Sequence, residues 1–443
     1  MSEKSPSELL KEAEDVRRAM RIGARRAFVL ELTGTPKAGK TTTLSTLQAF
    51  FKAAGLRVET LKERAADCPL PMKGHFFFNA WTMCTMLAEV LANHETPVDI
   101  LLLDRGFFDA LIWLDLQHQR SQVTDDERKV FEAFVLLERW QTLVDFTIVM
   151  TTDPHKAMER EHKSQLIPRD GSLMNVDSLT QFNEATKRTI DSHGEKFRHI
   201  VIDTTNSTDA KQSCVRLLSE ALPILMEWAN PLIEVVPRAV AESVFAGQPY
   251  LDQEAAVADA LELLCKAAIP MRRMDAEQDD QVVQIVVGGV PINPNAELMV
   301  FQRDSKDEKS TAYGSRIVWR GCHVEHTEQP TLATLATAVS NRLESELHLR
   351  TTLVPEIIGL ASPGSEMTEG VKSPDRKHLG VLFKVKVSDD VAKTLHDKAF
   401  KKSGRGHPFK GLFRKQEDVI AELDGLELEP WSKHIVQNWR IDA

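Results

Sequence analysis

The sequence predicts an α/β protein that begins with a three-layer domain, a parallel sheet with helices on both faces, and continues with an α+β domain. Three observations predict this fold class. In the first half of the chain, five short apolar strands alternate with helices, an order typical of a parallel sheet buried on both faces. A glycine-rich segment lies between the first strand and the helix that follows it. Near residue 280 the pattern changes to successive strands with a helix among them, which indicates a second domain.

Size and composition limit the classes of function. The chain has 443 residues, too many for one hydrophobic core, and this length predicts two domains. The formal net charge of −10 argues against general binding to nucleic acid or to an anionic membrane. Five scattered cysteines without a CxxC pair argue against a zinc ribbon or a disulfide scaffold. The first residues lack the apolar core of a signal peptide, and no apolar run approaches a membrane span, so we expect a cytoplasmic protein.

The first domain is expected over residues 27–229, after an N-terminal helix within residues 1–26. Its strands are recognised as short apolar runs, and Gly55 ends the helix that follows the glycine-rich segment as a natural C-cap. In chain order, the expected elements are a helix at 7–25, a strand at 27–32, a helix at 39–55, a strand at 56–63, a helix at 76–94, a strand at 98–106, a helix at 125–144, strands at 145–152 and 199–205, and a last helix at 209–229.

A proline-containing link, NPLIEVVPRAV, follows the first domain. With the helical pattern of AVADALELLCKAA, it predicts a helical linker over residues 230–279. The second domain is expected over residues 280–443. Its expected elements are strands at 281–289, 296–303, 315–321 and 378–387, with a helix at about 331–348 between the third and the fourth strand.

Residues 34–41 fit the pattern GxxxxGK[ST], in which each residue type has a physical role. The glycines let backbone N–H groups curl around an anion, and the positive end of the following helix faces the same ligand. Lys40 supplies a point charge to the terminal phosphates, and the hydroxyl of Thr41 is a Mg²⁺ ligand. We therefore expect ATP and Mg²⁺ to bind, although the pattern does not separate a kinase from a GTPase or a motor ATPase. The expected nucleotide-binding residues are Gly34, Thr35, Pro36, Lys37, Ala38, Gly39, Lys40, Thr41 and Thr42.

Charged residues follow two further strands of the predicted sheet. Asp104 and Arg105 stand at the end of ILLLD, and Glu63 and Arg64 stand at the end of the second strand. Ligands of open α/β sheets bind at these strand ends. An aspartate there can hold Mg²⁺, an arginine can clamp an anionic acceptor, and a carboxylate can accept a proton from an attacking hydroxyl. The alternatives are a salt bridge that caps a strand end for the first pair and a solvated charge pair for the second.

A basic segment follows the fourth strand, in DPHKAMEREHKSQLIPRDG. It contains Arg160, Lys163 and Arg169. A basic loop that closes over transferring phosphates neutralises charge and excludes water. A solvated charge run is the alternative that the segment alone favours.

These residues together resemble the thymidylate kinase and deoxynucleoside kinase group of P-loop kinases over residues 27–228. The resemblance implies that Arg105 contacts acceptor-side phosphates and that Glu63 acts near the 5′-hydroxyl of the acceptor. Two features depart from thymidylate kinases, because the loop holds TPKA without an aspartate and the second strand ends in LKERA. The identity of the acceptor therefore stays open, and the lack of an NKxD motif argues against a GTPase. The resemblance also implies that the helix after the second strand holds the base through Phe78, Asn79 and Trp81, although core packing explains Phe78 equally well.

The second half of the chain contains the strand end RGCHVEH, the helical segment TLATAVSNRLESELHL and the later strand HLGVLFKVKV. With these segments, the second domain is similar to Nudix-type domains over roughly residues 280–443. Active members carry a helix of the form REUxEExGU, whose glutamates bind Mg²⁺ on one helix face. Here Arg342 replaces the first glutamate and Ser345 the next, and an arginine repels a cation. The resemblance thus implies a Nudix fold without pyrophosphatase activity, which could bind a nucleotide or serve as a regulatory or assembly module. Glu346 stays in register, Glu344 is displaced, and Glu325 and Glu328 lie upstream. The basic loop at 401–416 contains Lys401, Lys402, Arg405, Lys410, Arg414 and Lys415, for which a solvated loop is the expected use.

The sequence as a whole predicts ATP-dependent phosphoryl transfer to a small-molecule nucleoside or nucleoside monophosphate. Two alternatives stay open: an ATPase switch or sensor that signals through a non-catalytic Nudix-like domain, and a bifunctional kinase with Nudix hydrolase activity. Neither a membrane nor a nucleic acid is expected as a partner, and the oligomeric state is left open, a homodimer included. The predicted catalytic residues are Lys40, Glu63, Arg105 and Arg160, and the predicted metal ligands are Thr41 and Asp104.

Overall fold

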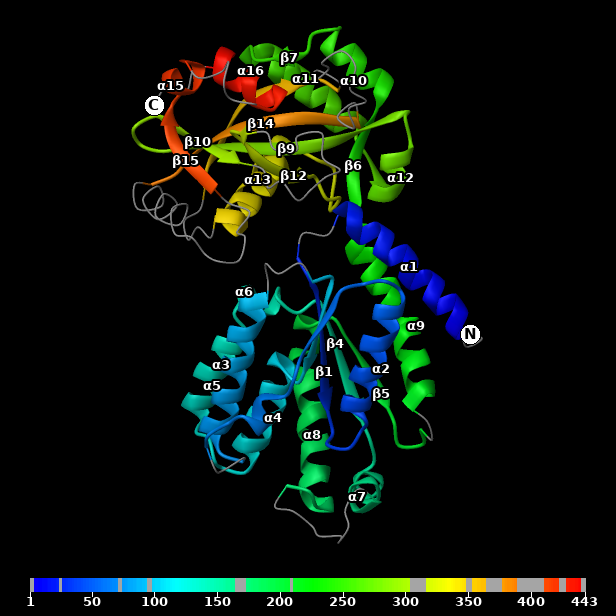
Figure 1. Ribbon diagram of the computed structural model, residues 1–443. Coiled ribbons are helices and arrows are strands. Elements are labelled where there is room, and N and C mark those ends of the chain that lie inside the picture. The colour runs from blue at the N-terminus through cyan, green and yellow to red at the C-terminus, as the bar shows by residue number, and fades with distance from the viewer. Residues whose placement is uncertain are drawn as a thin grey trace. The chain divides into compact units, whose positions relative to one another are not determined.

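The chain forms two compact units in the computed structural model, Met1–Asn230 and Pro231–Ala443 (Figure 1). The structure describes residues 4–23, 26–70, 74–93, 98–163, 173–207, 210–302, 316–347, 353–363, 377–388, 410–421 and 428–439. Over these ranges, no helix combines the length and the apolar character needed to cross a membrane.

A parallel sheet forms the centre of the first unit. Its five strands follow the order β2-β3-β1-β4-β5, and every neighbouring pair runs parallel. The predicted parallel sheet is therefore confirmed, with all five predicted strands present. β1, β3 and β4 are almost wholly buried, which explains their uninterrupted apolar sequences. The strands are β1 (Phe28–Gly34), β2 (Val58–Leu61), β3 (Ile100–Asp104), β4 (Phe146–Thr151) and β5 (His199–Asp203).

Helices cover both faces of this sheet, as the sequence predicts (Figure 1). On one face α2 and α9 pack on the strands, and α1, in which Leu9, Ala13 and Val16 are buried, packs on α9. On the other face α3, α4, α5 and α8 share one hydrophobic core. The helices are α1 (Pro6–Gly23), α2 (Lys40–Ala53), α3 (Phe76–Asn93), α4 (Phe107–Gln119), α5 (Asp125–Val135), α6 (Glu138–Gln141), α7 (Pro154–Lys163), α8 (Val176–His193) and α9 (Ala210–Ala229), with short 3₁₀ turns at Arg64–Ala66 and Gly194–Lys196.

One predicted helix of this unit is interrupted. The segment 125–144 forms α5 and α6 rather than a single helix, because Leu137 leaves helical geometry with φ −56° and ψ 127°. α5 begins with a capping box, in which Thr124 and Glu127 satisfy each other's backbone N–H groups. The helical periodicity continues across the break, so the sequence does not reveal it.

The second unit is built on a mixed ten-stranded sheet. The main path is β11-β10-β9-β14-β13-β7, with β12 and β6 paired to β9, β15 paired to β10, and β8 paired to β6. β14 runs parallel to β9, and the remaining pairs are antiparallel. The strands are β6 (Leu232–Pro237), β7 (Tyr250–Leu251), β8 (Ile269–Arg272), β9 (Val282–Ile292), β10 (Glu297–Gln302), β11 (Arg316–Ile317), β12 (Arg320–His323), β13 (Pro355–Ala361), β14 (His378–Lys386) and β15 (Lys410–Lys415).

The central strand β9 is buried on both faces and separates two cores. Ile285 and Val287 belong to the core that includes residues of α13, whereas Val286 and Val290 belong to the core that includes Trp431 of α16. The helices of this unit are α10 (Arg238–Phe245), α11 (Glu254–Ala267), α12 (Arg273–Gln278), α13 (Leu332–Leu347), α15 (Gln416–Ala421) and α16 (Pro430–Asn438).

Two predictions for this half of the chain need correction. The segment 230–279 is not a helical linker, because β6, β7 and β8 within it join the sheet and the whole segment from Pro231 onward belongs to the second unit. Val235, Val236 and Pro237 of the run LIEVVP pair with β9, a long-range contact that the local sequence does not show, whereas the predicted helical pattern AVADALELLCKAA forms most of α11. The predicted loop at 401–416 contains a strand, since β15 pairs with β10 along its whole length. The rest of that loop, with Lys401, Lys402 and Arg405, lies outside the described residues.

Candidate active site

The glycine-rich loop joins β1 to α2, as its pattern requires. Gly34 has φ +115°, and a Cβ atom there would collide with the carbonyl oxygen of Met150 on the neighbouring strand. Gly39 has φ +96° and precedes α2 as an N-cap without a side chain. The first backbone N–H groups of α2 therefore have no side-chain cap, which leaves this helix end suited to an anion.

Lys40 is buried inside the loop. Its ammonium group donates hydrogen bonds to the carbonyl oxygens of Gly34 (2.9 Å) and Thr35 (2.8 Å). Burial lowers the pKa of Lys40, and the nearby guanidinium group of Arg105 lowers it further. A buried ammonium group that donates to neutral carbonyls gains strongly from a direct contact with an anion such as a phosphate. Thr41 and Thr42 follow on the exposed side of α2.

Residues from β4, α7 and the segment after β5 support the loop from outside. The hydroxyl of Thr204 donates to the carbonyl oxygen of Ala38 at 3.0 Å. Arg160 donates to the carbonyl oxygens of Lys37 (3.2 Å) and Thr204 (2.6 Å). In the structure, the predicted catalytic residue Arg160 therefore stabilises the loop through hydrogen bonds to backbone carbonyl groups. Lys163 pairs with Glu159, and Arg169 lies outside the described residues.

Arg105 connects the ends of β2 and β3. Its side chain is 14% exposed, and the guanidinium group pairs with Glu63 (Nε to Oε1, 2.9 Å) and with Asp109 (Nη1 to Oδ1, 2.7 Å). The backbone of Arg105 has φ +66°, a conformation that turns the chain sharply from β3 into α4. Asp109 also accepts a hydrogen bond from the hydroxyl of Thr33 at 2.6 Å. The guanidinium group is therefore fixed in one orientation by two carboxylates.

Asp104 is a buried carboxylate in the same group. It is 8% exposed, and burial raises its pKa, while Arg105 and Lys40 act in the opposite direction. The negative charges of Glu63 and Asp109 also raise the pKa of Asp104. The predicted residues Lys40, Glu63, Asp104 and Arg105 are thus brought together at one edge of the sheet. The oxygen atoms of Asp104 and Thr41 are of the kind that Mg²⁺ prefers.

Glu31 and Asp109 are site residues that the sequence analysis missed. Glu31 lies on β1, is fully buried, and accepts hydrogen bonds from the backbone N–H groups of Phe107 (3.1 Å), Phe108 (3.2 Å) and Asp109 (3.0 Å). It therefore caps the N-terminus of α4 from another element. Burial raises the pKa of Glu31 to about 7, although the three hydrogen bonds act to lower it. A signal existed in the sequence, since Glu31 is the one charged residue in the apolar run AFVLEL.

The residues expected to hold a base occupy α3. Phe78 and Asn79 are buried, and the amide of Asn79 donates to the carbonyl oxygen of Ala110 on α4 at 3.0 Å. Trp81 is partly buried. Asn79 therefore joins two helices in this structure, and a contact of these side chains with a base stays a prediction.

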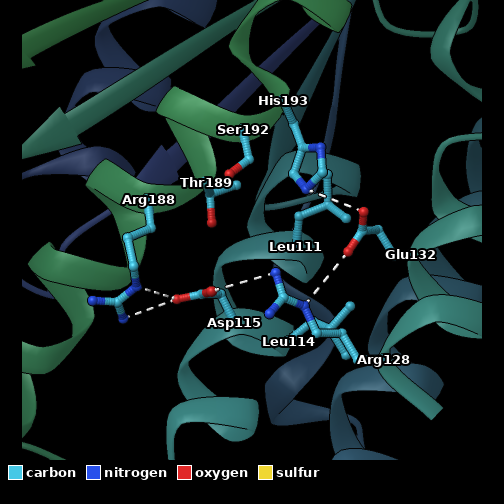
Figure 2. A pocket seen from close by; sticks show the side chains of 9 residues that line it. All are labelled: Leu111, Leu114, Asp115, Arg128, Glu132, Arg188, Thr189, Ser192 and His193. Carbon is cyan, nitrogen blue, oxygen red and sulfur yellow. Dashed lines mark hydrogen bonds and ion pairs between the residues drawn. The ribbon is translucent and has the colours of Figure 1, made fainter. Parts of the chain in front are cut away.

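A second polar group lies between α4, α5 and α8 and lines a small pocket (Figure 2). Asp115 pairs with Arg188 at 2.9 Å and with Arg128 at 3.9 Å, and Arg128 continues to Glu132 at 3.6 Å. His193 lies 3.6 Å from Glu132, and burial lowers the pKa of this histidine. The charged side chains of this group neutralise one another, so we interpret the group as a structural connection between three helices.

Comparisons with solved structures find distant likenesses to this chain. No protein-family model matches the chain, and no curated protein matches it. A structure named Tm1382 and assigned as a Nudix hydrolase is 19% identical, with a TM-score of 0.32, and the match covers 46% of this chain and 94% of that one. Deoxyadenosine kinase from M. mycoides with bound dCTP is 17% identical, with a TM-score of 0.35, and 44% and 98% of the two chains are covered. The same kinase with bound dATP is 15% identical, with a TM-score of 0.35, and 44% and 99% are covered. Values this low carry no argument about the function of this chain.

The helix with the Nudix-like pattern is α13. The carboxylate of Glu344 accepts a hydrogen bond from the backbone N–H of Leu353 at 3.2 Å, which gives it a structural role. Glu325 and Glu328 are exposed, and the side chains of Ser345 and Glu346 lie outside the described residues. Among the described residues, no group of potential metal ligands involves α13.

Proposed function

We propose that the first unit is an ATP-dependent kinase that transfers the γ-phosphoryl group to a hydroxyl group of a nucleoside or nucleoside monophosphate. The observation that carries this proposal is the convergence of the glycine-rich loop with Glu63, Asp104 and Arg105 at one edge of a parallel sheet. Phosphoryl transfer requires charge neutralisation and positioning more than covalent chemistry by the protein, and this group supplies both.

Each residue has a defined part in the proposed reaction. The ammonium group of Lys40 leaves the carbonyl oxygens of Gly34 and Thr35 and binds the terminal phosphates of ATP. Thr41 and Asp104 would hold Mg²⁺, which neutralises phosphate charge when bound. Glu63 accepts the proton of the acceptor hydroxyl while the oxygen of that hydroxyl forms a bond to the γ-phosphorus. The bond between the γ-phosphorus and the oxygen that bridges it to the β-phosphate breaks, which releases ADP.

The charges at this edge favour an uncharged acceptor. Glu63, Asp104 and Asp109 are acidic, whereas Lys40 and Arg105 are the cations that act on them. Arg105 is already paired with two carboxylates, and a phosphate on the acceptor would have to displace one of them. A monophosphate would thus add negative charge to a site that is already acidic. We therefore propose that the preferred acceptor is a nucleoside and not a nucleoside monophosphate.

A screen of acceptors tests the proposal. The full chain is incubated with Mg²⁺ and γ-labelled ATP against nucleosides and their 5′-monophosphates, and transfer of label to a nucleoside is the expected result. Lys40→Ala should lower kcat/KM by at least ~100-fold because it removes preorganised charge. Lys52→Ala, on the last turn of the same helix, should leave it unchanged.

Glu63→Gln tests the proposed proton acceptor. It should lower kcat by about 10²- to 10⁴-fold while ATP binding is kept. Slow hydrolysis of ATP with no labelled product from any acceptor would refute the kinase and support the alternative of a nucleotide-operated switch. Transfer to monophosphates but not to nucleosides would refute the charge argument alone.

A further inference from the structure

Three potential metal ligands meet in the second unit. Within the described residues, the carboxylate of Glu277 and a ring nitrogen from each of His323 and His378 lie within 4.8 Å of one another. The Nε2 atoms of the two histidines are 3.2 Å apart. All three side chains are partly buried, so solvent reaches them.

The sheet explains how these residues meet. His323 ends β12 and pairs with Val286, and His378 begins β14 and pairs with Gln284, so the two histidines flank β9 from opposite sides. Paired residues point to the same face of a sheet, and so do residues two apart on one strand. Both imidazoles therefore stand on the same face of β9, above Gln284 and Val286. Glu277 comes from α12, which precedes β9.

The spacing of the imidazoles matches a tetrahedral zinc ion. Ligand nitrogens about 2.0–2.1 Å from zinc lie about 3.3 Å apart in a tetrahedron. The observed separation of the Nε2 atoms of His323 and His378 is 3.2 Å. The carboxylate of Glu277 lies within 4.8 Å of both ring nitrogens, so it stands close enough to supply the third ligand after a small change of its rotamer.

The ordinary alternative is a hydrogen bond between the two imidazoles. It accounts for the distance between the two rings, but not for the carboxylate that faces both. It also leaves Gln284 unexplained. This side chain is fully buried on the same face of β9, and neither its amide oxygen nor its amide nitrogen has a hydrogen-bond partner among the described residues. An orphaned buried amide beside three ligands indicates an additional polar group, such as a metal-bound water.

We propose that Glu277, His323 and His378 form a zinc site with a water molecule in the fourth position. Two histidines and one glutamate with an open position are a ligand set that zinc accepts in proteins. The site is distinct from the helix with the Nudix-like pattern, because the side chain of Val286 faces the core of α16 whereas Val339 of α13 packs on the opposite face of β9. It would also fasten α12 to β12 and β14.

Zinc binding to the full, tag-free chain tests the site. Metal is removed by a chelator, and Zn²⁺ is then titrated at pH 7.5 against a chromogenic chelator. One equivalent is expected to bind, and Co²⁺ should give the visible absorption of a four-coordinate complex. His323→Ala, His378→Ala and Glu277→Gln should each weaken binding by more than ~100-fold, since even residues that only support a ligand cost 10- to 100-fold.

Two controls keep the proposal falsifiable. His434→Gln changes a partly buried histidine of the same unit outside the cluster and should bind zinc as the wild type does. Circular dichroism identifies variants that fail to fold, and Glu277→Gln tests the ligand set with a conservative change if the histidine variants do fail. A wild type without one bound equivalent, or folded ligand variants that bind zinc as tightly as the wild type, would overturn the site and leave the hydrogen bond as the explanation.

Discussion

The buried carboxyl group of Glu31 gives the sharpest test of how the site is assembled. Replacing it by Glu31→Gln removes a titrating group while keeping the size of the side chain. The oxygens of Glu31 accept three backbone N–H groups at the start of α4, the helix that presents Asp109 to Arg105. The variant therefore changes the charge at the base of the site with little change in volume.

The magnitude follows from the pKa of Glu31, which burial raises from 4.5 to about 7. Below about pH 4.5 the carboxyl group is protonated in both the folded and the unfolded state. Between about pH 4.5 and 7 the folded state holds a proton that the unfolded chain releases, so the free energy of unfolding falls as the pH rises. Above about pH 7 both states are ionised and the loss is complete. A shift of this size corresponds to ~3 kcal/mol.

The assay compares the pH dependence of stability in the two proteins. Urea unfolding is followed by hydrogen-exchange mass spectrometry at peptides of α4, which reports on the first unit. The free energy of unfolding of the wild type should fall relative to Glu31→Gln by ~3 kcal/mol between pH 5 and 8. A constant offset from altered hydrogen bonding does not affect this slope. Equal slopes would mean that Glu31 stays ionised because its hydrogen bonds outweigh burial, and would refute the reasoning.

Three other substitutions have clear expected outcomes. Gly34→Ala places a Cβ atom against the carbonyl oxygen of Met150 and should abolish ATP binding and lower the melting temperature, whereas Gly39→Ala meets open space and should cost only ~1 kcal/mol for its positive φ. Equal melting temperatures of the two variants would contradict this. Glu429→Ala removes a buried acceptor that caps α16 and binds the indole N–H of Trp319 at 3.0 Å, so thermal unfolding of the second unit should show a loss of ~3 kcal/mol. A loss under ~1 kcal/mol would argue against a cooperative role of this carboxylate.

The first unit could be predicted from sequence because its signals are local. Apolar runs such as ILLLD mark buried strands directly, and the glycine-rich loop requires a strand before it and a helix after it. The segment 230–279 differs from the predicted helical linker for the opposite reason. Its strands β6, β7 and β8 are stabilised by partners far along the chain, and no local pattern reports such pairing.

The candidate site also contains residues with a local sequence signal and residues without one. Glu63, Asp104 and Arg105 were predicted because each follows a strand, and the ends of parallel strands meet at one edge of the sheet. Asp109 was missed because it lies one helical turn beyond Arg105, inside α4, where a carboxylate usually faces solvent. Its burial depends on the turn at Arg105, which the sequence does not show.

The second unit shows how a sequence pattern and a geometry can indicate different places. The Nudix-like pattern in α13 predicts glutamates as ligands, yet an arginine stands at position 342 and the carboxylate of Glu344 accepts the backbone N–H of Leu353. The geometry instead joins residues that no short motif contains, since His323 and His378 are 55 positions apart. Metal sites assembled across a sheet depend on strand register, because a shift by one residue turns a side chain to the other face. The register of β12 and β14 on β9 places both imidazoles on one face. Zinc binding by this unit would therefore depend on the register of the sheet and not on the glutamates of α13.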